Sequence, residues 1–236
     1  MKFILTLFFL LTASAAAQQQ AVKFMSVDGC KIEAFYAAPS SGNYIFINAH
    51  GLGSGKEEWG SFQAALAERG HGWLSLDLRG HGGSKACGGK PADYRKFTQA
   101  DWGGASRDIE AAAGWLKKKG YRKIIFCGAS IGANLSLKAA AEGAVKPAAV
   151  ILLSPGLDYA GVRPELYLAK APKRLLFAAA EDDPYAWRSA AALSGLAGRS
   201  DLSAAAIDGG LGHGVSMFKT PGTIKKILDW AALLSP

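Results

Sequence analysis

The chain has 236 residues, of which 50% are hydrophobic and 19% are charged, and its formal net charge is +8. A chain this long and this apolar can bury a full core as one domain, which excludes an intrinsically disordered protein. Its basic residues are scattered rather than clustered with aromatic residues, so a nucleic-acid-binding role is also disfavoured.

The first 17 residues form a separate segment. A short basic start precedes an apolar run and then the small residues at 13–17, which is the pattern of a secretory signal peptide. We expect cleavage after Ala15 or Ala17, so that residues 18–236 form a single exported domain, periplasmic or secreted. A retained membrane anchor is the alternative, but the apolar run is short for a span, and no later stretch reaches that length.

Three cysteines follow the predicted signal peptide, at positions 30, 87 and 127. An odd number of widely spaced cysteines does not indicate a disulfide framework. Cys127 ends an apolar strand pattern and is expected to be an inert core thiol. Cys30 and Cys87 could pair in an oxidising compartment, and the sequence leaves this open.

Strand and helix patterns alternate along most of the chain, after a hairpin signal at Asp28-Gly29. Strands are expected at 21–27, 31–38, 44–49, 72–78, 123–127, 148–153, 174–180 and 203–207. Helices are expected at 59–70, 102–120, 131–141, 185–196 and 224–234, with a surface loop at 85–98. This order predicts an α/β fold with a mostly parallel eight-stranded sheet, helices on both faces and an antiparallel N-terminal hairpin.

The segment Gly128-Ala129-Ser130-Ile131-Gly132 stands between a predicted strand and a predicted helix. A Gly-x-Ser-x-Gly pattern in this context is typical of a nucleophile elbow, a strained turn that exposes the serine hydroxyl. The following helix directs its free N–H groups and positive dipole end toward the serine, which favours developing negative charge. In a chain with 29 glycines, however, the pentapeptide alone is moderate evidence.

Three further polar residues follow two later strands. Asp182 and Asp183 come after the strand that ends at Ala180, and His213 comes after the strand that ends at Ile207. Considered separately, Asp183 is typical of a residue at the start of a helix, and His213 is typical of a residue in a loop. Because the carboxyl ends of parallel strands meet at one edge of the sheet, their order after Ser130 predicts a Ser-Asp-His catalytic group.

Three more segments carry a resemblance to a known family. They are His50-Gly51-Leu52-Gly53 after the third strand, the segment Asp77-Leu78-Arg79-Gly80-His81-Gly82-Gly83-Ser84, and the Ala-Ala-Glu-Asp-Asp-Pro stretch at 179–184. With the elbow, they resemble the α/β-hydrolase superfamily over residues 22–235, in its esterase, lipase or serine aminopeptidase-like branch.

The resemblance implies a role for each position. Ser130 would be the nucleophile, His213 the general base and Asp183 the acid, while the backbone N–H groups of Leu52 and Ile131 would form the oxyanion hole. The family usually has a glycine three residues before the acid, where this chain has Ala180, so Asp182 is an alternative acid. The resemblance also implies that His50 and His81 are structural loop residues and that Asp77 forms a turn.

The expected activity is hydrolysis of a carboxylic ester or thioester through an acyl-enzyme. The alternatives are an aminopeptidase or amidase that uses the same triad, and a catalytically inactive binding module. The cap domain of the family is reduced here to residues 157–172, so a near-lidless site for small or exposed acyl esters is expected. Gly51 to Lys56 does not fit a phosphate loop, and no dinucleotide or metal-ligand pattern is present, so no cofactor or metal is predicted.

Overall fold

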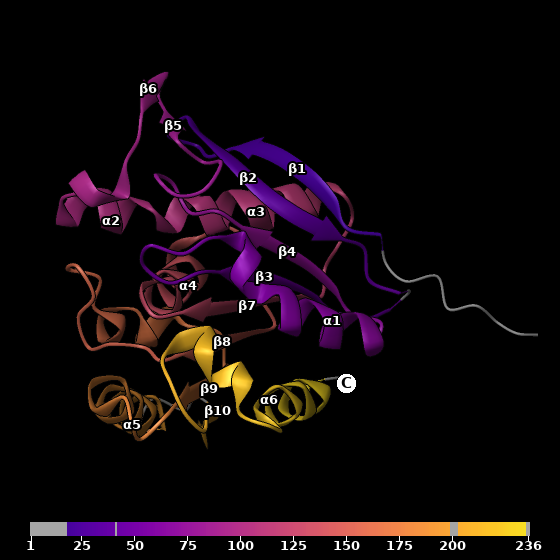
Figure 1. The fold of residues 1–236 in the computed structure, drawn as a ribbon, viewed down its shortest axis with the longest axis vertical. Helices are drawn as coiled ribbons and strands as arrows, with labels where there is room; N and C mark the ends of the chain where they lie inside the picture. The colour runs from indigo at the N-terminus through magenta and orange to yellow at the C-terminus, as the bar shows by residue number, and fades with distance from the viewer. Residues whose placement is uncertain (1–17, 41, 199–202, 235–236) are drawn as a thin grey trace, which may run out of the picture.

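The computed structural model describes residues 18–40, 42–198 and 203–234. The signal peptide predicted at 1–17 lies outside the described residues. The described chain is built around a twisted sheet in the order β10-β9-β8-β7-β3-β4-β2-β5-β6, with β1 paired to β2. In Figure 1 the sheet runs from β1 and β2 at the top to β9 and β10 at the bottom. The strands are β1 (Gln20–Met25), β2 (Cys30–Ala37), β3 (Ile45–Ala49), β4 (Gly72–Leu76), β5 (Ala86–Cys87), β6 (Lys90–Pro91), β7 (Ile124–Ala129), β8 (Ala149–Leu153), β9 (Arg174–Ala179) and β10 (Ser203–Asp208).

The central part of the sheet is parallel, as the sequence predicts. β4, β3, β7, β8, β9 and β10 pair in parallel along this order, while β2 pairs antiparallel with β1 and β4. The strands β3, β4, β7 and β8 are buried along their whole length, as expected for strands that helices cover on both faces. The carboxyl ends of β3, β7, β8, β9 and β10 therefore meet at one edge.

The strand count differs from the prediction because of one small hairpin. Among the described residues the sheet has ten strands, and two of them, β5 and β6, are only two residues long. They lie in the segment 85–98, which the sequence indicates to be a loop. Their pairing depends on contact with β2, and a sequence pattern this short cannot reveal such a contact. The other eight strands are the predicted ones.

Helices cover both faces of the sheet. They are α1 (Gly60–Glu68), α2 (Gln99–Gly104), α3 (Ser106–Lys118), α4 (Ile131–Glu142), α5 (Pro184–Gly198) and α6 (Thr223–Ala232). One core cluster joins α3, α4 and α5 to the sheet, and the other joins α1 and α6 to its opposite face. In Figure 1, α1 and α6 lie next to each other. The single helix predicted at 102–120 is divided at Ala105 into α2 and α3.

A disulfide and an ion cluster hold the first part of the chain. Cys30 on β2 is bonded to Cys87 on β5, which ties the small hairpin to the sheet, and Cys127 is a free, buried thiol. Arg79 donates hydrogen bonds to the carboxylates of Asp28 and Asp108, joining the loop after β4 to the β1–β2 turn and to α3. Asp108 is fully buried, so this pairing compensates its charge and fixes that loop.

No helix among residues 18–40, 42–198 and 203–234 is both long enough and apolar enough to cross a membrane.

Candidate active site

Ser130 lies in a strained turn between β7 and α4. Its φ is 56° and its ψ is −125°, in a region that residues with a Cβ rarely adopt. The flanking glycines make this turn possible, because a Cβ at Gly128 would collide with the carbonyl of Gly132, and a Cβ at Gly132 would collide with the carbonyl of Ala49. The Gly-x-Ser-x-Gly segment therefore adopts the elbow geometry that the sequence predicts.

Asp183 and His213 are joined by a hydrogen bond. The carboxylate of Asp183, at the start of α5, bonds to Nδ1 of His213, which follows β10. The Asp183 side chain is 18% exposed and the His213 side chain 46%, so the carboxylate is the more sheltered partner. This bond fixes the orientation of the imidazole and leaves Nε2 free to face a reacting group.

Asp182 has a different contact. Its carboxylate oxygens accept the backbone N–H of Gly212 at 2.9 and 3.0 Å, one residue before His213. The hydroxyl of Ser154, at the end of β8, accepts the N–H of Gly214 at 2.8 Å on the other side of the histidine. Asp182 and Ser154 therefore hold the backbone of the histidine loop, whereas Asp183 contacts the imidazole itself.

Ser130 and His213 line the same cavity, which has a volume of about 250 Å³. Within the described residues, no hydrogen bond joins the Ser130 hydroxyl to the imidazole. The phenol of Tyr159, from the loop after β8, lies close to Ser130 and donates its own hydrogen bond to the carbonyl oxygen of Ser154 at 3.4 Å. Proton transfer from Ser130 to His213 requires that a hydrogen bond between them forms first.

The loop after β3 approaches the serine closely. A Cβ built on Gly51 would lie 3.4 Å from the Cβ of Ser130, so this loop forms the adjacent wall of the cavity. In the described part of the chain, the backbone N–H groups of Leu52 and Ile131 have no acceptor. Two unpaired N–H donors beside a nucleophile are what an oxyanion hole requires.

His50 and His81 support this loop through backbone contacts. His50 is fully buried, its Nδ1 bonds to the carbonyl of Gly51 at 2.7 Å, and its Nε2 accepts the N–H of Leu78 at 3.0 Å. Nε2 of His81 accepts the N–H of Gly53 at 3.3 Å. Both histidines therefore make the structural contacts that the resemblance implies, and Asp77 likewise accepts the N–H groups of Lys56 and Gly83.

The buried state of His50 predicts a stability loss in mild acid. Burial lowers the pKa of His50 from 6.5 to about 4, against a smaller opposing effect of the Gly51 carbonyl. Between these two values the unfolded chain binds a proton at His50 that the folded chain excludes. The contribution of neutral His50 to the free energy of unfolding is therefore complete above pH 6.5 and is lost as the pH falls toward 4. We expect about 3 kcal/mol of unfolding free energy to be lost between these values because of this group.

The measurement is urea unfolding at several pH values for the wild type and for His50→Gln. The variant will be less stable at pH 7, but its unfolding free energy will fall less steeply between pH 6.5 and 4. Parallel curves for the two proteins would show that His50 is not the group responsible.

Glu58 is a site residue that the sequence does not reveal. It lies in the cavity wall and accepts the N–H of Gly51 at 3.2 Å and the hydroxyl of Ser54, so it holds the loop that carries Leu52. Burial raises the pKa of Glu58, although its two hydrogen bonds oppose the rise. In the sequence, Glu58 is one of several polar residues that precede a helix pattern, and Tyr159 lies in a short irregular segment. Neither position carries a recognisable motif, so only the tertiary structure places these two side chains beside the site.

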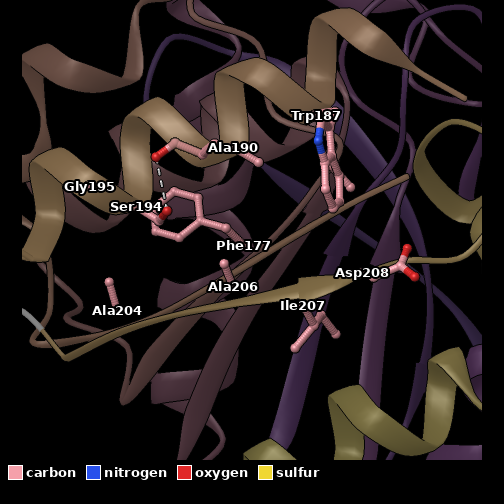
Figure 2. Close-up of a pocket in the computed structure, with 11 residues that line it drawn as sticks. Phe177, Trp187, Ala190, Ser194, Gly195, Ala204, Ala206, Ile207 and Asp208 are labelled. Carbon is pink, nitrogen blue, oxygen red and sulfur yellow. Dashed lines mark hydrogen bonds between the residues drawn. The ribbon is translucent and has the colours of Figure 1, made fainter. Parts of the chain in front are cut away.

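A second cavity, of about 410 Å³, lies between α5 and β10. Figure 2 shows Phe177 within it, with Trp187 and Asp208 toward one end and Ala204 toward the other. Its lining is mainly apolar and includes none of Ser130, Asp183 and His213. The described residues also contain no group of three or more His, Cys, Asp or Glu side chains that could hold a metal ion. The cavity at Ser130 is therefore the candidate reaction site.

Comparison with solved structures shows the same fold in several enzymes. The esterase Pf2001 of Pyrococcus furiosus aligns over 93% of this chain and 94% of its own, with a TM-score of 0.77 and 15% identity. A dienelactone hydrolase from Anabaena variabilis aligns over 93% and 97%, with a TM-score of 0.65 and 22% identity. Est1E of Butyrivibrio proteoclasticus, solved with ferulic acid bound, aligns over 90% and 100%, with a TM-score of 0.67 and 21% identity.

No curated protein sequence matches the chain. At the identities of these solved structures, the similarity shows the fold alone. The sequence model of the alpha/beta hydrolase family, in contrast, matches residues 45–236, which include the elbow and every candidate site residue. The chain therefore belongs to the alpha/beta hydrolase family.

Proposed function

We propose that the protein is a serine hydrolase that cleaves carboxylic esters or thioesters through an acyl-enzyme on Ser130. The observation that carries the proposal is the hydrogen bond between Asp183 and His213, whose imidazole lines the same cavity as the strained Ser130. A serine hydroxyl is a weak nucleophile until a base takes its proton, and a histidine oriented by a carboxylate is such a base.

The reaction follows from these positions. His213 Nε2 accepts the proton of Ser130 as Oγ attacks the carbonyl carbon, and Asp183 stabilises the imidazolium that forms. The carbonyl oxygen becomes negatively charged beside the unpaired N–H groups of Leu52 and Ile131. The proton on His213 then passes to the leaving group, and water, activated by the same histidine, releases the acid and restores Ser130.

The shape of the site favours a small or exposed acyl ester as substrate. The cavity at Ser130 is about 250 Å³, and the segment after β8 contributes only two short 3₁₀ turns, at Pro164–Leu166 and Leu168–Lys170. Several proteins that share the fold are named esterases, which supports an ester over an amide. The mechanism requires neither cofactor nor metal.

We further propose that the mature protein is exported, to the periplasm or outside the cell, after removal of the signal peptide at 1–17. The bond between Cys30 and Cys87 supports this location, because disulfides form and persist in oxidising compartments.

The proposal predicts a preference for esters over amides. With one acyl group, here acetyl, the p-nitrophenyl ester will give a higher kcat/KM than the p-nitroanilide, because the ester carbonyl is intrinsically more reactive. A higher kcat/KM for the anilide, or for aminoacyl anilides, would favour the amidase alternative. If the protein turned over neither substrate and resisted a fluorophosphonate probe, the inactive binding module would be the better description.

A further inference from the structure

Tyr159 lies on the loop after β8, directly beside the proposed catalytic residues. Its ring centroid is 6.4 Å from that of His213, with the two rings nearly perpendicular at 84°, and 5.6 Å from that of Tyr185. Its hydroxyl donates a hydrogen bond to the carbonyl oxygen of Ser154 at 3.4 Å and lies close to Ser130. The phenol is thus within reach of the reacting atoms, but the mechanism above assigns it no role.

The loop that carries Tyr159 is held to the nucleophile helix. Asn134, fully buried on α4 one turn after Ser130, donates hydrogen bonds to the carbonyls of Gly156 and Val162 at 2.9 and 2.8 Å. It also accepts the N–H of Gly156 at 3.2 Å. The Asn134 side chain therefore binds both ends of the loop, which fixes the position of the Tyr159 phenol relative to Ser130.

Tyr159 remains a hydrogen-bond donor at neutral pH. Burial raises the pKa of Tyr159 to about 12, the negative charge of Asp183 adds to the rise, and the hydrogen bond from Ser130 opposes it. The phenol therefore carries its proton throughout the range in which His213 can work as a base.

The sheet order places the loop of Tyr159 and the loop of Leu52 on either side of the strand that delivers Ser130. β7, which delivers Ser130, lies between β3 and β8. The loop after β3 carries the Leu52 N–H and the loop after β8 carries Tyr159, so the two donors flank the serine on opposite sides. When the carbonyl oxygen points to Leu52 and Ile131, the bond to the leaving group faces His213, and Tyr159 lies beside that imidazole.

We propose that Tyr159 is a further catalytic residue, whose hydroxyl turns from the carbonyl oxygen of Ser154 and donates its hydrogen bond to the leaving-group oxygen as the acyl-enzyme forms. This inference rests on the proposed function. In the step, the bond between Ser130 Oγ and the acyl carbon forms, and the bond from that carbon to the leaving oxygen breaks. The proton that His213 took from Ser130 goes to the leaving oxygen, while Tyr159 keeps its own proton and stabilises the charge on that oxygen.

The role of Tyr159 should depend on the alcohol that leaves. A p-nitrophenolate leaving group stabilises its own negative charge and gains little from a donor, whereas the oxygen of a simple alkyl alcohol needs that stabilisation. The substrate class that Tyr159 favours is therefore esters of unactivated alcohols. Its hydroxyl should matter little for p-nitrophenyl acetate and much for ethyl acetate, although both yield the same acetyl-enzyme.

The test compares kcat/KM of Tyr159→Phe and the wild type on these two esters, since kcat/KM reports the acylation step. We expect a decrease of less than roughly 3-fold for p-nitrophenyl acetate and of roughly 10- to 100-fold for ethyl acetate. Phenylalanine keeps the ring contacts, so the variant will fold, and an unchanged melting temperature checks this. Tyr167→Phe is the matched control: Tyr167 lies in the same segment as Tyr159, its hydroxyl accepts a hydrogen bond from Lys138 on α4, and both rates should be unchanged when that hydroxyl is removed.

A selective loss on ethyl acetate supports the leaving-group role. An equal loss on both esters would overturn it and leave Tyr159 as a residue that only positions Ser130. No loss on either ester would also overturn it. These results are distinct from a failure of the proposed function, which would appear as absent turnover in the wild type.

Discussion

Ser130→Ala will abolish ester turnover, reducing kcat/KM for p-nitrophenyl acetate by about 10⁴- to 10⁶-fold. The variant lacks the hydroxyl oxygen that forms the acyl-enzyme in the proposed reaction, while the Asp183–His213 bond and the N–H groups of Leu52 and Ile131 remain. The side-chain change is small and alanine can occupy the same turn, although it must adopt the same positive φ. The measurement is a steady-state assay with the circular dichroism spectrum as a check on folding.

The residual rate in Ser130→Ala is also informative. Binding and the oxyanion hole alone can leave some catalysis above the rate in water. A variant that kept more than about a tenth of the wild-type rate would show that another group attacks the ester, since loss of a nucleophile costs far more than that.

Asp183→Asn and Asp182→Asn will have very different effects, although the two residues are adjacent. Asp183 bonds to the imidazole of His213, so an amide in its place loses the negative charge and disfavours the required tautomer, and kcat should fall by about 10⁴-fold. Asp182 accepts the backbone N–H of Gly212, which an asparagine oxygen can also accept, so a change of less than about 10-fold is expected.

The two variants form a matched pair, because each replaces one carboxylate oxygen with a nitrogen in the same short loop. Steady-state kcat and KM for p-nitrophenyl acetate measure the difference. A larger loss for Asp182→Asn than for Asp183→Asn would assign the acid role to Asp182 and contradict the contacts described here.

The elbow and the sheet are predictable because their determinants are local. Only glycine fits at positions 128 and 132, and fully apolar runs of strand length follow one another with helix patterns between them. The carboxyl ends of parallel strands converge, so Ser130, Asp183 and His213 can be expected together once the strands are placed. The antiparallel hairpin is likewise marked by Asp28-Gly29, and the structure contains it as β1 and β2.

Contacts between distant segments were not predictable to the same degree. The resemblance favours Asp183 and leaves Asp182 as an alternative, and the path of the loop after β9 decides which carboxylate reaches the imidazole. Glu58 is placed by its hydrogen bond from Gly51, and the loop of Tyr159 is placed by the hydrogen bonds of Asn134. No periodic sequence pattern encodes these contacts. The hairpin of β5 and β6 depends on β2 and on the bond between Cys30 and Cys87, a pairing that the spacing of three cysteines leaves open.

The most direct test of the account is to identify the residue that a fluorophosphonate probe modifies. The wild-type protein should take up one probe molecule, and mass spectrometry of its peptides should find the adduct on Ser130. Ser130→Ala should take up none. An adduct on any other side chain, or a folded wild-type protein that takes up no probe, would contradict the assignment of Ser130 as the nucleophile.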